Sequence, residues 1–216
     1  MYVENVEKDG VNMIQTWMGD VTSLLEDDQY FKYYHMVPVF RREKADKLRF
    51  QKDKALSVGA WVLFEKMRER YHLKPEVSFN LSHSGTYALC SVDDEEDSGV
   101  KVGCDLEEIK EDRMNVAKYF FCESEYQNIL ENRKSFYQYW VLKESFMKAT
   151  RLGMKLGMKE FAIGISEDGR PVLERKPDNI EGQYFFKEYE CGALPYRVAV
   201  CSNKDVFSDT LYIVEL

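Results

Sequence analysis

The chain has 216 residues, 44% of them hydrophobic and 14% aromatic, which is enough to bury the core of one large domain or two small ones. Thirty basic residues against 38 acidic ones give a net charge of −8, which disfavours nucleic acid or an anionic membrane surface as the main partner. An anionic small ligand would therefore need a local basic pocket.

The cysteines and the N-terminal residues indicate the cellular compartment in which we expect the protein. Five scattered cysteines without a C-x-x-C pair or clustered histidines predict reduced thiols and no zinc site. The first residues, MYVENVEKDG, have neither a basic nor an apolar leader region, and no apolar run is long enough to span a bilayer. We therefore expect a cytoplasmic protein.

In chain order, residues 1–35 hold short strand and helix candidates without a strong pattern. From Arg41 to Tyr71 the composition is helical, with a charged segment, RREKADKLRFQKDK, running into the apolar ALSVGAWVLFEKMRERY until Pro75 stops the helix. Three short β-like runs follow: VSFNL, TYALCSV and GVKVGCDL.

A second helical block is predicted from about Asp112 to Thr150. More strands are predicted after it, at about 160–165, 170–173, 183–189, 196–201 and 211–214. The order helices, strands, helices, strands predicts two α+β halves rather than alternating βαβ units.

The stretch VGCDLEE, residues 102–108, carries two carboxylates at strand spacing. Asp105 and Glu107 should project from one face, with Cys104 and Leu106 on the other. Carboxylates this close repel each other unless a cation lies between them, and their oxygens suit Mg²⁺. A half-exposed strand with an acidic outer face is the alternative.

The stretch WVLKESFMKA, residues 140–149, predicts a helix that carries charged residues on the same face as Trp140. Trp140, Lys143, Glu144, Met147 and Lys148 follow the spacing i, i+3, i+4, i+7, i+8. A surface ion pair between Glu144 and Lys148, one helical turn apart and worth about 0.2–0.5 kcal/mol, would explain these two charged residues. Because the preceding FYQYW is so aromatic, we expect burial, and buried charge needs a metal or a bound anion.

Two further stretches could hold a phosphate. In FNLSHSG, Ser82, His83 and Ser84 offer hydroxyls, an imidazole and backbone N–H groups in a tight turn, although such turns are common. No G-x-S-x-G is present, so Ser82 and His83 do not indicate a hydrolase pair. The basic segment carries Arg41, Lys44, Lys52 and Lys54 ahead of Ser57, and a solvated helix face is its alternative.

Taken in order, KDKALSVGA, FNLSHSG, VGCDLEE, FFCESEY and WVLKESFMKA resemble the 4′-phosphopantetheinyl transferase superfamily, specifically the surfactin-synthetase-activating (Sfp) type. Members move the phosphopantetheine arm of coenzyme A onto a serine of a carrier protein and leave 3′,5′-ADP. The resemblance implies an α+β fold of two similar halves, a pseudo-dimer in one chain, with the active site at their junction. The halves would be residues 1–108 and 109–216.

The resemblance also implies roles for single residues. Asp105, Glu107 and Glu144 would hold Mg²⁺ against the coenzyme A pyrophosphate, which Lys148 would also contact. Glu144, directly or through a metal-bound water, is the candidate base for the incoming serine, so the catalytic set is Glu144, Lys148 and Asp105. The remaining coenzyme A contacts would be Ser82 and His83 at the 3′-phosphate, together with Arg41, Lys44, Ser57 and Lys143. Glu125 matches an acidic position near the site and receives no role.

The sequence departs from the family pattern in three places. Family members usually hold a G-K-P motif before the FNLSHSG stretch, and here the short YHLKPEVS leaves only Lys74-Pro75 as its remnant, which puts one phosphate contact in doubt. Cys104 stands where Ile or Val is usual. An acidic insertion, residues 93–97, lengthens the hairpin before VGCDLEE and has no functional explanation.

The expected partner is an apo acyl, peptidyl or aryl carrier protein. Met114, Tyr119, Phe120 and Phe121 are candidates for its docking patch, and a functional monomer is expected. One alternative is a catalytically silent module that binds coenzyme A or a carrier protein. Another is a Mg²⁺-dependent phosphohydrolase using the same carboxylates, which would not explain the upstream serine, histidine and basic helix.

Overall fold

The computed structural model describes residues 12–95, 99–110 and 114–216. Its fold is mixed α+β, which confirms the predicted fold class at that level. The strands are β1 (Ile14–Asp20), β2 (Phe79–Ser84), β3 (Tyr87–Asp93), β4 (Val102–Glu108), β5 (Ala162–Ile165), β6 (Pro171–Arg175), β7 (Phe185–Tyr189), β8 (Tyr196–Ser202) and β9 (Phe207–Glu215). The α-helices are α1 (Asp27–Met36), α2 (Val39–Asp46), α3 (Gln51–Tyr71), α4 (Met114–Phe120), α5 (Glu123–Glu131) and α6 (Ser135–Ala149), with short 3₁₀ turns at Thr22–Leu25, Gly153–Lys155 and Met158–Glu160.

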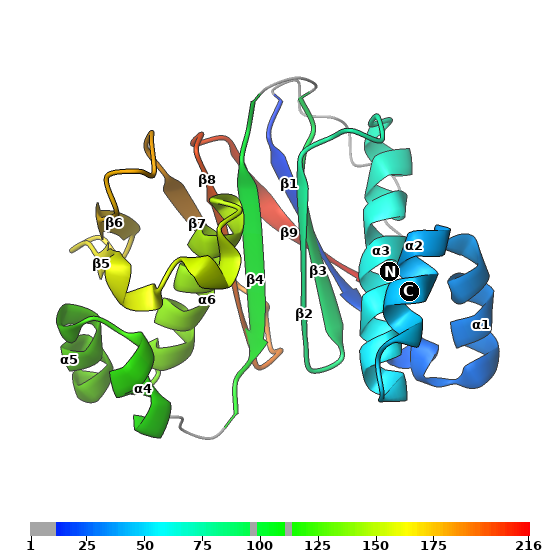
Figure 1. Ribbon diagram of the computed structural model, residues 1–216, viewed down its shortest axis with the longest axis horizontal. Coiled ribbons are helices and arrows are strands. Elements are labelled where there is room, and N and C mark those ends of the chain that lie inside the picture. The colour runs from blue at the N-terminus through cyan, green and yellow to red at the C-terminus, as the bar shows by residue number, and fades with distance from the viewer. Residues whose placement is uncertain (1–11, 96–98, 111–113) are drawn as a thin grey trace.

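The strands form three sheets. The first has the order β2-β3-β1-β9, the second β4-β8-β7, and β5 pairs with β6 alone. Neighbours are antiparallel except β1 and β9, which run parallel and so join the last strand of the chain to the first. In Figure 1, α1–α3 lie on one flank of the molecule and α4–α6 on the other, with the first sheet and β4 between them and β5 and β6 on the flank of α4–α6.

Of the four apolar clusters among the described residues, one joins α4, α5 and α6, and the other three hold the helices and sheets together. The long helix α3 packs Leu63, Phe64 and other apolar residues against the first sheet, and α6 packs Leu142 and Phe146 against the second. A third cluster joins residues of β1 and β3 to β4 and β8, so the two sheets also pack against each other. This third core fixes β4 beside β2 at the middle of the molecule.

One helix differs from the prediction. The helix expected from Arg41 to Tyr71 is interrupted between α2 and α3, where Phe50 is extended and caps the start of α3. The helix ends at Tyr71 as predicted, but His72 rather than Pro75 terminates it: His72 adopts the left-handed conformation, with φ +55°, and the Leu73 N–H donates to the Arg68 carbonyl. None of the described helices is both long and apolar enough to cross a membrane.

Candidate active site

A lysine, a carboxylate and a serine meet where β2, β4 and α6 come together. Lys148 Nζ donates to Asp105 Oδ1 at 2.6 Å and to Ser82 Oγ at 2.9 Å, and Ser82 Oγ donates to the same Asp105 oxygen at 2.8 Å. The Asp105 side chain is 6% exposed and that of Lys148 25%. The structure therefore brings three of the predicted site residues into one hydrogen-bonded cluster.

Gly103 explains why α6 comes so near to β4. A Cβ atom built on Gly103 would lie 2.1 Å from the Ser145 carbonyl oxygen and 2.3 Å from the Ala149 nitrogen. The backbone of α6 therefore rests directly on that of β4, which only glycine permits. Since alternate strand residues share a face, Asp105 and Glu107 project on the same side as Gly103.

Burial and neighbouring charges shift the pKa values of Glu144 and Lys148. Burial raises the pKa of the Glu144 carboxyl, the nearby Asp105 and Glu107 carboxylates raise it further, and Lys148 opposes them. Burial lowers the pKa of Lys148, but Asp105, Cys104 and Glu144 together raise it by more, so the net pKa is raised. The site thus holds more negative charge than its lysine compensates.

The donor atoms fit a hard divalent cation. Asp105 Oδ2 is buried and accepts no hydrogen bond from any described residue, and the Glu107 carboxylate stands close enough to Glu144 to raise the pKa of Glu144. Within the described part of the chain, no group of three or more Asp, Glu, His or Cys side chains already surrounds one point that could hold a metal. The carboxylates are candidate ligands that a cation would draw together.

The serine and histidine of FNLSHSG lie in a strand, not in a turn. Ser82 and His83 pair with Leu89 and Ala88 of β3, and the hairpin turn is made by the two residues after Ser84. The expected position in a tight turn is therefore wrong, whereas β2 is an edge strand whose backbone pairs with β3 on one side only. Ser84 Oγ instead donates to Glu107 Oε2 at 2.8 Å.

His83 points its imidazole to the surface beside basic groups. Partial desolvation lowers the pKa of His83, and the Lys148 and Lys44 cations lower it further. The imidazole is exposed, so a ligand can reach it. Its neighbourhood suits an anion, which would offset the repulsion by the two lysines.

A cavity of ≈ 470 Å³ lies beside the start of β2 and holds two of the predicted basic contacts. Arg41 and Lys44 line it from α2, and Arg151, which the sequence analysis overlooked, lines it from the end of α6. The Arg41 guanidinium lies 4.6 Å from the centre of the Trp61 ring. Ser57 does not line this cavity, since it is 3% exposed with its hydroxyl buried inside the protein.

Lys143 is the clearest correction to the predicted site. Its ammonium is fully buried and donates to Glu125 Oε1 at 2.6 Å and to the Phe161 carbonyl at 2.9 Å. Glu125 also accepts the backbone N–H groups of Cys122 and Ile163. The predicted phosphate contact of Lys143 is wrong, because this side chain ties α6 to α5 and β5 on the far side of the helix.

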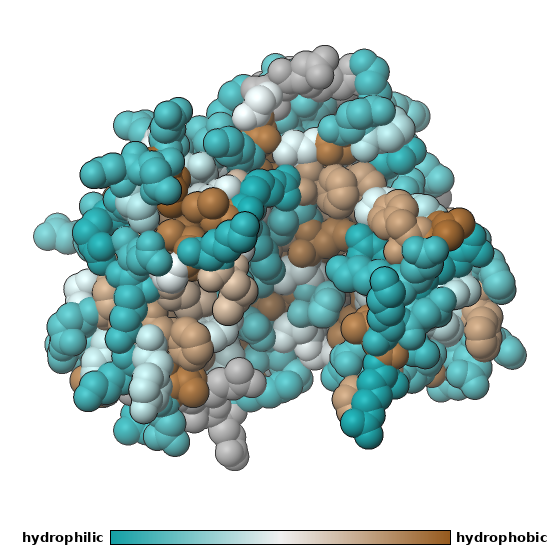
Figure 2. Space-filling view, in the orientation of Figure 1, coloured by the Kyte–Doolittle hydropathy of each residue, from teal (hydrophilic) through white to brown (hydrophobic). Residues whose placement is uncertain are grey.

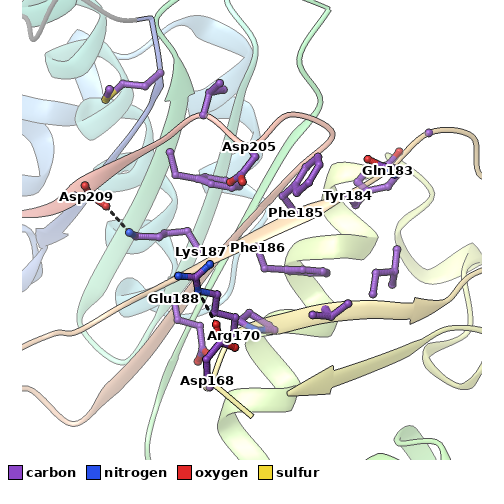
Figure 3. A pocket seen from close by; sticks show the side chains of 18 of the residues that line it. Asp168, Arg170, Gln183, Tyr184, Phe185, Phe186, Lys187, Glu188, Asp205 and Asp209 are labelled. Carbon is purple, nitrogen blue, oxygen red and sulfur yellow. Dashed lines mark hydrogen bonds and ion pairs between the residues drawn. The ribbon is translucent and has the colours of Figure 1, made fainter. Parts of the chain in front are cut away.

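Another cavity, ≈ 1030 Å³, lies elsewhere, between the β5–β6 hairpin, β7 and the start of β9 (Figure 3). Two ion pairs lie among its lining residues: Lys187 Nζ is 2.6 Å from Asp209 Oδ1, and Arg170 Nε is 3.1 Å from Asp168 Oδ2. None of the predicted site residues lines it. The size of a cavity therefore does not identify the active site. The smaller cavity, lined by Arg41, Lys44 and Arg151, lies beside residues 79–81 of β2, which directly precede Ser82.

A lysine, a serine and several carboxylates at the meeting of two sheets form an arrangement suited to phosphoryl chemistry. Residues 101–201 match the family model described as 4′-phosphopantetheinyl transferase superfamily. Among similar proteins, 4′-phosphopantetheinyl transferase Sfp of Bacillus subtilis (strain 168) is 32% identical over 145 residues, covering 65% of this chain and 61% of the relative. The transferase psf-1 of Bacillus pumilus is 36% identical over 145 residues, covering 65% and 59%.

Over these stretches the chain is similar to the 4′-phosphopantetheinyl transferase superfamily and to transferases of the Sfp type, the family that the motifs predicted. It spans about six tenths of the length of these two relatives. Among solved structures, Helicobacter pylori holo-acyl-carrier-protein synthase in complex with coenzyme A is similar with a TM-score of 0.39 and 19% identity, covering 46% of this chain and 96% of that one.

Proposed function

We propose that this protein transfers the 4′-phosphopantetheine arm of coenzyme A to a serine hydroxyl of an apo acyl, peptidyl or aryl carrier protein and releases 3′,5′-ADP. The observation that carries the proposal is the cluster of Lys148, Asp105 and Ser82, with Glu144 beside it. The match of residues 101–201 to the phosphopantetheinyl transferase family model supports the reaction type. The site would lie at the junction of two α+β halves, residues 1–108 and 109–216.

The pyrophosphate of coenzyme A would lie against Lys148, and Ser82 and His83 would meet the 3′-phosphate. The serine oxygen of the carrier attacks the phosphorus that bears the pantetheine arm, and the bond from that phosphorus to the bridging oxygen breaks. Lys148 is charged, since its pKa is raised, and stabilises the negative charge that develops on the leaving 3′,5′-ADP. Ser82 orients Lys148 and Asp105 through the hydrogen bonds described above.

Glu144 is the proposed base for the serine proton. Burial and two neighbouring carboxylates raise its pKa, which makes its carboxylate a stronger proton acceptor than an exposed glutamate. Asp105, Glu107 and Glu144 would hold Mg²⁺, which supplies charge neutralisation at the pyrophosphate. Asp105 Oδ2, buried without a hydrogen bond from any described residue, is the most direct candidate ligand atom.

The carrier protein is expected to dock near α4 and the central apolar area. Tyr119 is 76% exposed and Phe120 37%, while Phe121 is buried in the core and Met114 lies where no side chain is described. Figure 2 shows apolar residues gathered near the middle of this face between hydrophilic rims. Carrier proteins are commonly acidic, so an enzyme of net charge −8 would recognise them by such local surfaces.

Intact-mass spectrometry tests the proposal. Several apo carrier proteins are incubated with the protein, coenzyme A and Mg²⁺, with Glu144→Gln as the matched control. We expect a carrier to gain the mass of one phosphopantetheine arm, and the gain to be abolished in the control or when EDTA removes Mg²⁺. A folded protein that binds coenzyme A but modifies no carrier would instead support the silent binding module.

A further inference from the structure

Arg151 stands out because its backbone has a conformation that arginine seldom adopts. It follows the end of α6 with φ +61°, and its N–H donates to the Lys148 carbonyl. A helix commonly ends with glycine in this left-handed conformation, since a Cβ atom makes it unfavourable. Arginine is therefore unusual at this position, because its backbone conformation carries an energetic cost that glycine would avoid.

The side chain of Arg151 reaches across to β2. Its Nη2 donates to the Phe79 carbonyl at 3.2 Å, and it lines the same cavity as Arg41 and Lys44. Three cations from two separate parts of the chain therefore face one space, with Glu76 the only carboxylate among the lining residues. The resulting excess of positive charge calls for an anionic ligand.

The cations in this cavity have not been neutralised by the protein. Arg41 and Lys44 form no ion pair with a described residue, and Arg41 Nε is buried without a hydrogen-bond partner in the described chain. Burial lowers the pKa of Lys44, and Arg41 beside it lowers that pKa further. A bound phosphate would relieve both effects, because it supplies the missing negative charge and hydrogen-bond acceptors.

We propose that Arg151 is a specificity-determining residue, which binds the 3′-phosphate of coenzyme A together with Arg41 and Lys44. This inference rests on the proposed function. The cavity adjoins residues 79–81 of β2, immediately before Ser82, so the nucleotide end of coenzyme A would fill it while the pyrophosphate lies at Lys148. Arg151 would replace the phosphate contact that the shortened G-K-P region lacks.

Calorimetry with two ligands tests this assignment. Coenzyme A and dephospho-coenzyme A, which lacks the 3′-phosphate, are titrated into the wild-type protein and the Arg151→Gly variant in the presence of Mg²⁺. We expect Arg151→Gly to weaken binding of coenzyme A about tenfold or more, the usual size of a lost charge-assisted hydrogen bond. Binding of dephospho-coenzyme A should stay within about twofold.

Two controls separate the role of Arg151 from general effects. Lys155→Ala removes an exposed cation of the same loop that does not line the cavity, and should change neither affinity by more than about twofold. Because glycine accepts φ +61° without strain, Arg151→Gly should unfold at the wild-type temperature or above it. Arg151→Lys should restore part of the preference for coenzyme A.

The outcomes distinguish this inference from the proposed function. Equal affinity of wild type and Arg151→Gly for coenzyme A, or equal losses for both ligands, would overturn the role of Arg151 while leaving transfer to a carrier intact. Failure of the wild-type protein to bind coenzyme A would overturn the proposed function itself. A wild-type protein that transfers the arm but does not discriminate between the ligands would refute only the 3′-phosphate assignment.

Discussion

Two lysines on the same helix, Lys143 and Lys148, have different environments despite their similar place in the motif. Lys143 is fully buried against Glu125 with a side-chain distance of 2.6 Å, whereas Lys148 is partly exposed at the junction of β2 and β4. Burial lowers the pKa of Lys143, and the Glu125 carboxylate offsets only part of that effect. We infer that Lys143 stabilises the fold and that Lys148 serves the chemistry.

Replacement of each lysine by methionine tests this division. Lys143→Met leaves Glu125 as an uncompensated buried charge, so we expect the free energy of unfolding to fall by about 3–5 kcal/mol. Adding Glu125→Gln should recover part of that loss. Lys148→Met should lower the transfer rate by about 10²–10³ with a smaller loss of stability.

Urea unfolding and transfer rates per folded molecule are the measurements. An active, stable Lys148→Met variant would contradict the role proposed for Lys148. A Lys143→Met variant of wild-type stability that binds coenzyme A poorly would instead restore the phosphate role that the sequence first suggested for Lys143.

At the scale of elements, the position of α6 on β4 determines whether Glu144 and Lys148 lie close to Asp105. Gly103→Ala would place a methyl group 2.1 Å from the Ser145 carbonyl oxygen, and backbone atoms on both sides cannot move aside separately. Overpacking commonly costs about 1–3 kcal/mol, and we expect at least the upper end here. Transfer should also fall, since α6 carries Glu144 and Lys148 away from Asp105.

Gly169→Ala is the matched control for this substitution. Gly169 has φ +82° with no atom near its added Cβ, so it reports the cost of backbone strain alone, about 1–2 kcal/mol. Thermal unfolding and transfer assays on both variants should give a normal rate for folded Gly169→Ala and a reduced rate for Gly103→Ala. Equal effects would show that helix position does not control activity.

The same elements show what the sequence could and could not predict. Strands follow local apolar periodicity, so β2–β4 and the later strands lie near the predicted bounds, whereas the single helical block predicted from about Asp112 to Thr150 is three helices, α4, α5 and α6. Lys143 was misplaced because α6 is buried on several sides, and periodicity does not tell which buried side faces a ligand. Arg151 was missed because its contact with the Phe79 carbonyl joins residues 72 positions apart.

At the scale of the whole molecule, the last described strand, β9, lies beside β1, the first described strand. β9 pairs in parallel with β1, Tyr212 lies 6.0 Å from Trp17, and the Leu216 carbonyl accepts a hydrogen bond from Ser23. β4, in turn, has its ladder partner β8 in the second half of the sequence. Elements from residues 1–108 and 109–216 therefore complete each other's sheets, a pairing that no local pattern in the sequence reveals.

We expect neither half to fold alone. A fragment of residues 1–110 would leave β1 without β9 and β4 without β8, exposing two unpaired strand edges and the apolar residues of the third core. Circular dichroism should show no cooperative unfolding for this fragment or for residues 111–216. Mixing the two, which leaves the same break in the chain but restores every strand pair, should recover cooperative unfolding and transfer to a carrier. Cooperative unfolding of residues 1–110 alone would instead mean that the α3 core stabilises the first half without β9, and that the halves are independent domains.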